Sequence, residues 1–121
     1  MFATMPSALP LVKADQLKAL AVTSLGRSPA IPEIPAVAES LPGFEATAWR
    51  GIVVPRNTER RIVERLNREI ATILGREESR QRLASEGAEP KPTNPEGFGS
   101  YIQSEKKKWA RVIELSGVKA D

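Results

Sequence analysis

The sequence predicts an α/β fold. Residues 17–23 form a nearly continuous apolar run of strand length, and residues 44–54 alternate apolar and polar side chains. Apolar residues at three- and four-residue spacing predict amphipathic helices over residues 58–74 and 95–116. With 121 residues, 40% hydrophobic and 27% charged, the chain has the composition of one modest globular domain.

The first elements are a short helix and a strand. Residues 6–14 predict the helix, with Ser7 as its cap and Pro10 accepted because it is expected to lie within the first turn. Asp15 tolerates turn conformations and ends this helix. The apolar run 17–23 then fits a strand that is buried on both faces.

A proline-rich loop follows this strand. Four prolines between residues 24 and 43 remove backbone donors and favour extended geometry, so we expect an ordered, extended loop. Residues 36–40 predict a helical turn before Pro42 and Gly43. The alternating segment 44–54 predicts a long strand that ends at Pro55, with Gly51 at a bend.

Capping residues delimit three further helices. Thr58 is the expected cap of the first of them, and Gly75 is its expected left-handed C-terminal residue. A second helix, 77–86, ends at Gly87, and residues 88–90 add only a short edge segment. Asn94 followed by proline begins the long last helix, which continues up to Gly117. Its apolar stripe places three aromatic or aliphatic side chains on the buried side: Phe98, Ile102 and Trp109.

The composition argues against catalysis. Cysteine and histidine are both absent, which removes thiolate nucleophiles, the commonest general base and the commonest transition-metal ligands. The glutamates map to polar helix faces, and no pair stands out as an acid and base couple. We therefore expect no enzyme, no cofactor and no metal. The first residues show no export-signal pattern, and no apolar run has the length of a transmembrane helix.

A basic cluster offers a nucleic-acid interpretation. Three lysines, residues 106–108, adjoin Trp109, an arrangement that also occurs where an aromatic ring stacks on a base. The net charge is only +3 and the charges are interleaved, so a solvated helix face is the preferred interpretation and no nucleic-acid partner is expected. A basic nucleic-acid binder stays as the weaker alternative.

The order of motifs identifies a family. Leu20-Ala21-Val22-Thr23 is followed by Arg27-Ser28, a Pro-x-x-Pro loop, Val37-Ala38-Glu39, Leu41-Pro42-Gly43, Trp49 and Gly51. This order closely resembles the Bug family, the periplasmic solute receptors of tripartite tricarboxylate transporters. The similarity continues through Leu66-Asn67, Arg82-Leu83, Gly87-Ala88, Glu105 and Trp109. Two departures stand out: Ala36 replaces a usual threonine and Asp15 replaces a usual glycine.

The resemblance implies a fragment of a two-lobed, periplasmic-binding-protein-like fold. Only the C-terminal portion of such a receptor resembles this chain. Residues 1–43 would be a remnant of the second lobe with the proline-rich loop. Residues 44–55 would form a crossing strand, and residues 56–121 would be the C-terminal helical part of the first lobe.

The resemblance also implies a function. Members capture small carboxylic acids in the periplasm for integral-membrane transporter subunits, through donors from both lobes. In this chain Phe2, Thr4 and Ser7, at the start of a helix that suits an anion, would be remnants of the ligand site. An ordinary capping role for Ser7 is an equal alternative. Because neither lobe is whole, we expect weak ligand binding and a homo-oligomer; a small self-associating protein without a ligand is the rival interpretation.

Overall fold

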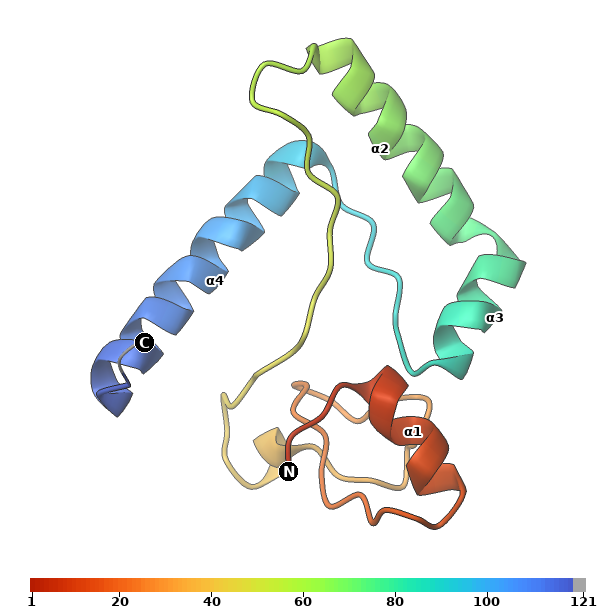
Figure 1. Cartoon of the computed structure of the whole chain (residues 1–121), viewed down its shortest axis with the longest axis vertical. Helices are drawn as coiled ribbons and strands as arrows, with labels where there is room; N and C mark the ends of the chain where they lie inside the picture. Colours follow the sequence, from red (N-terminus) through yellow and green to blue (C-terminus); the bar gives the residue numbers. More distant parts are fainter. Residues whose placement is uncertain (119–121) are drawn as a thin grey trace. The chain divides into compact units, whose positions relative to one another are not determined.

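A computed structural model describes residues 1–118 of the chain. Its elements are α1 (Met5–Lys13), the 3₁₀ turn η1 (Val37–Glu39), α2 (Arg60–Gly75), α3 (Glu77–Ser85) and α4 (Pro95–Ser116), coloured in order in Figure 1. The chain divides into two compact units. Unit 1 comprises residues 1–53 and 73–90, and unit 2 comprises residues 54–72 and the chain from Lys91 on.

Thr4, rather than the predicted cap Ser7, is the residue that precedes the first turn of helix α1. Thr4 has an extended backbone, and its carbonyl accepts hydrogen bonds from the amides of Ser7 and Ala8, each 3.1 Å long. The expectation for Pro10 was also wrong, because Pro10 lies beyond the first turn of a helix that starts at Met5. It therefore leaves the carbonyl four residues earlier without its usual helical donor.

The end of α1 confirms the predicted role of Asp15. Asp15 has a φ of 57°, in the left-handed region that glycine adopts without strain. Its amide donates to the Val12 carbonyl at 3.1 Å, and the amide of Gln16 donates to the Leu11 carbonyl at 2.9 Å. These two bonds form a Schellman motif in which an aspartate takes the place of the usual glycine.

The apolar core of unit 1 is small and local in sequence. It consists of four buried side chains, Leu9, Val22, Ile31 and Ala36. Three partly buried residues pack against them: Met5, Ala30 and Ile34. The core thus joins α1 to the proline-rich loop.

The strand predicted at residues 17–23 is almost absent. Val22 alone forms a parallel bridge, in which its amide donates to the Pro35 carbonyl and its carbonyl accepts from the Val37 amide, both at 2.9 Å. The expectation of burial was wrong for Leu20, which is exposed. The prolines at 29, 32 and 35 explain the short pairing, because they remove donors that a longer ladder needs.

The second predicted strand, residues 44–54, is extended but lacks sheet neighbours. One backbone hydrogen bond joins it to a distant segment, from the Ala46 amide to the Thr23 carbonyl at 2.9 Å, and a second, from the Phe44 amide to the Leu41 carbonyl at 3.0 Å, closes the turn before it. Across the described residues no backbone pairing involves residues 50–54, so a strand is not formed there.

Helices α2 and α3 follow the predicted pattern with shifted ends. The α2 helix begins at Arg60, after the Glu59 carbonyl accepts from the Val63 amide, so Thr58 is not its cap. Gly75 is the last helical residue and has no left-handed φ, contrary to expectation. Helix α3 ends as predicted at Gly87, whose φ is 69°. A Cβ atom at Gly87 would lie only 2.0 Å from Cγ of Met5.

Helix α4 begins and ends as predicted. The Asn94 side chain accepts a hydrogen bond from the Gly97 amide at 2.7 Å, and Gly117 closes the helix with a φ of 67°. Within unit 2, the Asn67 side-chain amide donates to the Thr93 carbonyl at 2.7 Å and ties α2 to the start of α4.

The prediction that Trp109 is buried was wrong for this chain. Trp109 is 42% exposed, while Glu105, one turn earlier, is only 7% exposed. The described part of unit 2 buries no hydrophobic side chain. The apolar stripes of α2 and α4 therefore remain open in the isolated chain.

Candidate ligand-binding site

The three predicted ligand residues lie at the start of α1, but only two of them interact. The hydroxyl of Ser7 donates to the Thr4 carbonyl at 2.8 Å, and the two hydroxyl oxygens of Thr4 and Ser7 lie 3.0 Å apart. Phe2 is 89% exposed and lies outside the helix. The structure therefore brings Thr4 and Ser7 together and leaves Phe2 apart from them.

The donors available to an anion at this helix start are few. The first turn of α1 holds no acidic residue, which favours a negative ligand there. Pro6 has no amide hydrogen, and the amides of Ser7 and Ala8 already donate to Thr4. Among the described residues the Met5 amide has no acceptor. An anion at this helix start would therefore find one amide donor and two hydroxyls, and the hydroxyls would first have to break their present hydrogen bonds. Such a site is weak.

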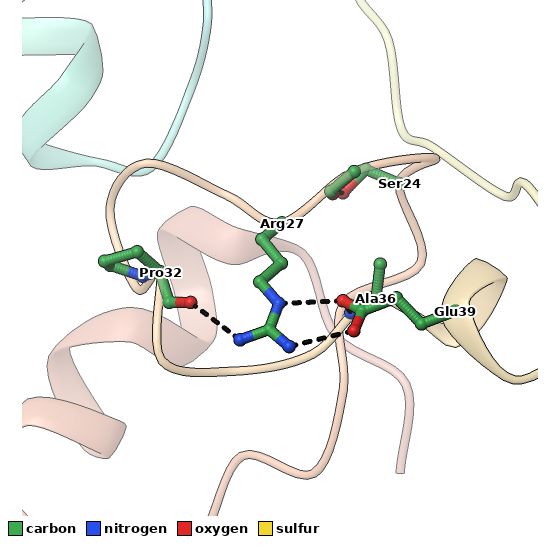
Figure 2. Close-up of polar contacts among 6 residues, drawn as sticks. Ser24, Arg27, Pro32, Ala36 and Glu39 are labelled. Atoms are coloured by element: carbon green, nitrogen blue, oxygen red, sulfur yellow. Dashed lines mark hydrogen bonds and ion pairs between the residues drawn. The ribbon is translucent and has the colours of Figure 1, made fainter.

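A second polar cluster holds the proline-rich loop in shape. Figure 2 shows the Arg27 guanidinium between the Pro32 carbonyl and the Glu39 carboxylate. Its Nε and Nη2 atoms donate to Oε1 and Oε2 of Glu39, both at 2.8 Å, and Nη1 donates to the Pro32 carbonyl at 3.3 Å. The Ala36 amide donates to Oε1 of Glu39 at 2.9 Å. The loop is thus closed by a two-point ion pair.

These contacts shift the pKa of the Glu39 carboxyl and that of the Arg27 guanidinium in opposite directions. The hydrogen bond from Arg27, followed by that from the Ala36 amide, lowers the pKa of Glu39 to about 2. The same hydrogen bond to Glu39 raises the pKa of Arg27. The pairing of Arg27 with Glu39 could not be predicted from the sequence, because nothing in the spacing of a loop shows which residues its path brings together. The signals present were their opposite charges on either side of a run of prolines and their places in the order of motifs.

An open hollow of about 490 Å³ lies within unit 1, beside the proline-rich loop. Its walls are residues 28–30 of the loop, Arg80 and Ala84 of α3, and residues 87–90. Arg80 is the single cation among these wall residues, and Glu89 is the single acid.

Helix α4 carries a polar cluster around Glu105. The Trp109 indole N–H donates to Oε2 of Glu105 at 3.1 Å, and Nζ of Lys108 lies 2.5 Å from Oε1. Lys108 also lies 5.7 Å from the centre of the Trp109 ring. The lysine and the ring are thus engaged with each other and with Glu105, although Trp109 stays 42% exposed.

Within residues 1–118, no group of three or more acidic, cysteine or histidine side chains is placed to hold a metal ion. No helix over the same residues is both long and apolar enough to cross a membrane.

Comparison with solved structures defines the class of the protein. The chain superposes on the R. palustris protein Rpa4515, solved with adipate, with a TM-score of 0.84 and 32% identity. The match covers 93% of this chain and 38% of Rpa4515. It superposes on the periplasmic binding protein BugD with a TM-score of 0.83 and 29% identity, over 94% of this chain and 39% of BugD. The chain therefore has the fold of part of a two-lobed periplasmic binding protein, and the predicted α/β class is confirmed.

Sequence comparison identifies the family. A family model described as the tripartite tricarboxylate transporter family receptor matches residues 1–118, so the chain belongs to that family. A Pseudomonas sp. strain P51 protein, from the tcbD-tcbE intergenic region, is 38% identical over 84% of this chain and 31% of its own length. The chain spans about a third of the length of this relative, and the predicted resemblance to part of such a receptor is confirmed.

Proposed function

We propose that this chain is the C-terminal part of a periplasmic receptor that captures small carboxylic acids for integral-membrane transporter subunits. Its membership of the receptor family supports this proposal, as does its similarity to Rpa4515, which was solved with adipate. Binding, not catalysis, is the proposed mechanism. The observation that supports it lies at the start of α1, where the hydroxyl oxygens of Thr4 and Ser7 are 3.0 Å apart and the neighbouring Met5 amide has no acceptor among the described residues.

The proposed roles follow from this geometry. The Thr4 and Ser7 hydroxyls would rotate to donate to a carboxylate, and the Met5 amide would add a third hydrogen bond. Phe2, exposed beside them, would cover the apolar part of the acid. These donors are too few to hold a carboxylate tightly, so the isolated chain binds acids weakly and the remaining donors come from the rest of the receptor.

A chimera tests the proposed function. The segment of Rpa4515 that matches this chain is replaced by this chain, and calorimetry measures binding of adipate and other dicarboxylates and tricarboxylates. A folded chimera should bind at least one acid, and the double substitution Thr4→Val and Ser7→Ala should weaken binding at least about tenfold, or about 1.4 kcal/mol. Ser116→Ala, at the far end of α4, serves as the control. A folded chimera that binds none of these acids contradicts the proposal.

Self-association without a ligand is a second candidate, and exposed apolar side chains favour it. Ile62 and Leu66 on α2 and Val112 and Ile113 on α4 are all open to solvent. Apolar surfaces of this kind are rarely left uncovered in soluble monomers. We propose that the isolated chain associates with a second copy through these side chains. Light scattering that gives a stable mass near 13.2 kDa, with one cooperative melt, contradicts this second candidate.

A further inference from the structure

The hollow of unit 1 carries two opposite charges that are not paired with each other. Arg80 and Glu89 are its charged wall residues, and within residues 1–118 neither side chain forms an ion pair or a hydrogen bond. All of the wall residues belong to unit 1, so this unit forms the hollow by itself. A cation and an acid that both lack a partner on one hollow suit a ligand with one anionic and one cationic group.

Ser28 adds a buried hydroxyl to the same hollow. It is 7% exposed, and its oxygen accepts a hydrogen bond from the Ala30 amide at 3.3 Å. The hydrogen of this hydroxyl has no acceptor among the described residues, and the backbone amide of Ser28 has none either. Burial of a donor without an acceptor costs free energy. A ligand oxygen at this wall would therefore complete a hydrogen bond that the chain leaves unmade.

The rest of the hollow leaves room for a short chain molecule. Its other wall residues are small or proline: Pro29, Ala30, Ala84, Gly87, Ala88 and Pro90. None of them has a side-chain hydrogen-bonding group, so the surface between the charged residues offers apolar side chains and backbone groups. The volume of about 490 Å³ lies in the range of about 300–1,000 Å³ that is usual for small-molecule sites.

The separation of the two charges favours a short peptide over a single amino acid. Because Arg80 and Glu89 do not form an ion pair, the opposite charges of their ligand must also lie apart. Each residue that is added to a peptide moves its two ends apart by up to about 3.8 Å. A dicarboxylic acid fits less well, because its second carboxylate would face Glu89 and be repelled.

We infer that this hollow is a binding site for a short zwitterionic peptide with free ends, of the size of a dipeptide. The peptide carboxylate pairs with Arg80, the ammonium pairs with Glu89, and the Ser28 hydroxyl donates to an oxygen of the peptide. The site shares no residue with the start of α1, where the carboxylic acid is proposed to bind. It therefore does not rest on the proposed function.

Titration of the full 121-residue chain with dialanine, followed by NMR of the backbone amides, tests the inference. Saturable shift changes are expected at the wall residues Ala30, Gly87 and Ala88. Dialanine with an acetylated amino end and dialanine with an amidated carboxyl end each lack one charge, and each should have a Kd at least about tenfold higher. Free alanine should also bind at least about tenfold more weakly, and excess adipate should not displace dialanine.

Glutamine substitutions test the two charges of the chain. Arg80→Gln and Glu89→Gln should each raise the Kd for dialanine at least about tenfold. Both variants should melt like the parent, because neither charged group has a partner within residues 1–118. Arg82→Gln and Glu78→Gln are the matched controls, since they remove charges of α3 that lie outside the hollow, and they should bind like the parent.

Four outcomes would overturn the inference. The first is dialanine that does not saturate the chain, and the second is shift changes that fall outside residues 28–30 and 80–90. The third is alanine, adipate or a capped dialanine that binds as tightly as dialanine, because the occupant would then not be a zwitterionic peptide. The fourth is control variants that weaken binding as much as Arg80→Gln and Glu89→Gln, because this indicates an effect of net charge alone.

Discussion

Two oxygens of the Glu39 carboxylate accept hydrogen bonds from two nitrogens of the Arg27 guanidinium, each 2.8 Å long, across the proline-rich loop. Two-point pairing fixes the orientation of both side chains, which a single contact does not. Because Pro32 and Ala36 also bond to this pair, the ion pair sets the path of the loop between them.

This ion pair predicts a pH dependence of stability. The pKa of Glu39 is lowered from 4.5 to about 2 in the folded chain. A carboxyl with a lowered folded pKa stabilises the fold above its unfolded pKa, and that stabilisation is lost as pH falls through the folded value. The melting difference between the parent and Glu39→Gln should therefore be full near neutral pH and should shrink between about pH 4.5 and about pH 2. An unchanged difference at pH 2 contradicts the assignment.

A second prediction concerns Asp15 at the end of α1. An L-residue with a side chain pays roughly 1–2 kcal/mol in the left-handed region, and Asp less than most. Asp15→Gly should therefore raise the free energy of unfolding by about 0.5–1 kcal/mol, even though glycine has more freedom in the unfolded chain. Asp15→Ala is the matched control and should not stabilise. Denaturant titration of the parent and the two variants measures their free energies of unfolding. A glycine variant that is less stable than the parent contradicts the prediction.

The Glu105 and Trp109 pair gives a third prediction. Because Trp109 is 42% exposed, its loss costs less than the removal of a fully buried aromatic. Trp109→Phe keeps an aromatic side chain and removes the indole donor, which leaves one oxygen of the buried Glu105 without this bond. The cost should be about 1–3 kcal/mol. In a Glu105→Gln background the same substitution should cost less, and equal costs in the two backgrounds would show that the hydrogen bond is not responsible.

Gly87 provides a fourth prediction, because two separate features exclude a side chain there. Its φ is 69°, and a Cβ would lie 2.0 Å from Cγ of Met5. Gly87→Ala should lower the free energy of unfolding by about 2–4 kcal/mol, from backbone strain together with overpacking. In a Met5→Ala background, Gly87→Ala should lower the free energy of unfolding by less, because only the backbone strain remains. A Gly87→Ala protein that melts like the parent would show that α1 does not lie against this residue.

The helices could be predicted from sequence because their signals are local. Asn94, Gly87 and Gly117 cap or end helices through bonds to residues three to five positions away, and all three were assigned correctly. The strand assignments failed for the opposite reason, since residues 17–23 and 44–54 need neighbours that lie elsewhere. Asp15 is the intermediate case, because its residue type indicated a turn but not the left-handed backbone that it adopts there.

The position of the candidate residues along the chain could be predicted, but their contacts could not. The sequence placed Thr4 and Ser7 near a helix start, and the structure shows them 3.0 Å apart. The sequence did not indicate that Thr4, rather than Ser7, precedes the first turn of α1, because either residue type suits that position. The Arg27 and Glu39 pair was missed, because a pair twelve residues apart depends on the route of the loop between them.

The small core of unit 1 has a consequence for the order in which the chain acquires structure during synthesis. All four buried apolar side chains lie between Leu9 and Ala36, so every contact among them closes a short stretch of chain. Contacts of this kind form early and fast. The core can be complete on the ribosome before α2 is made.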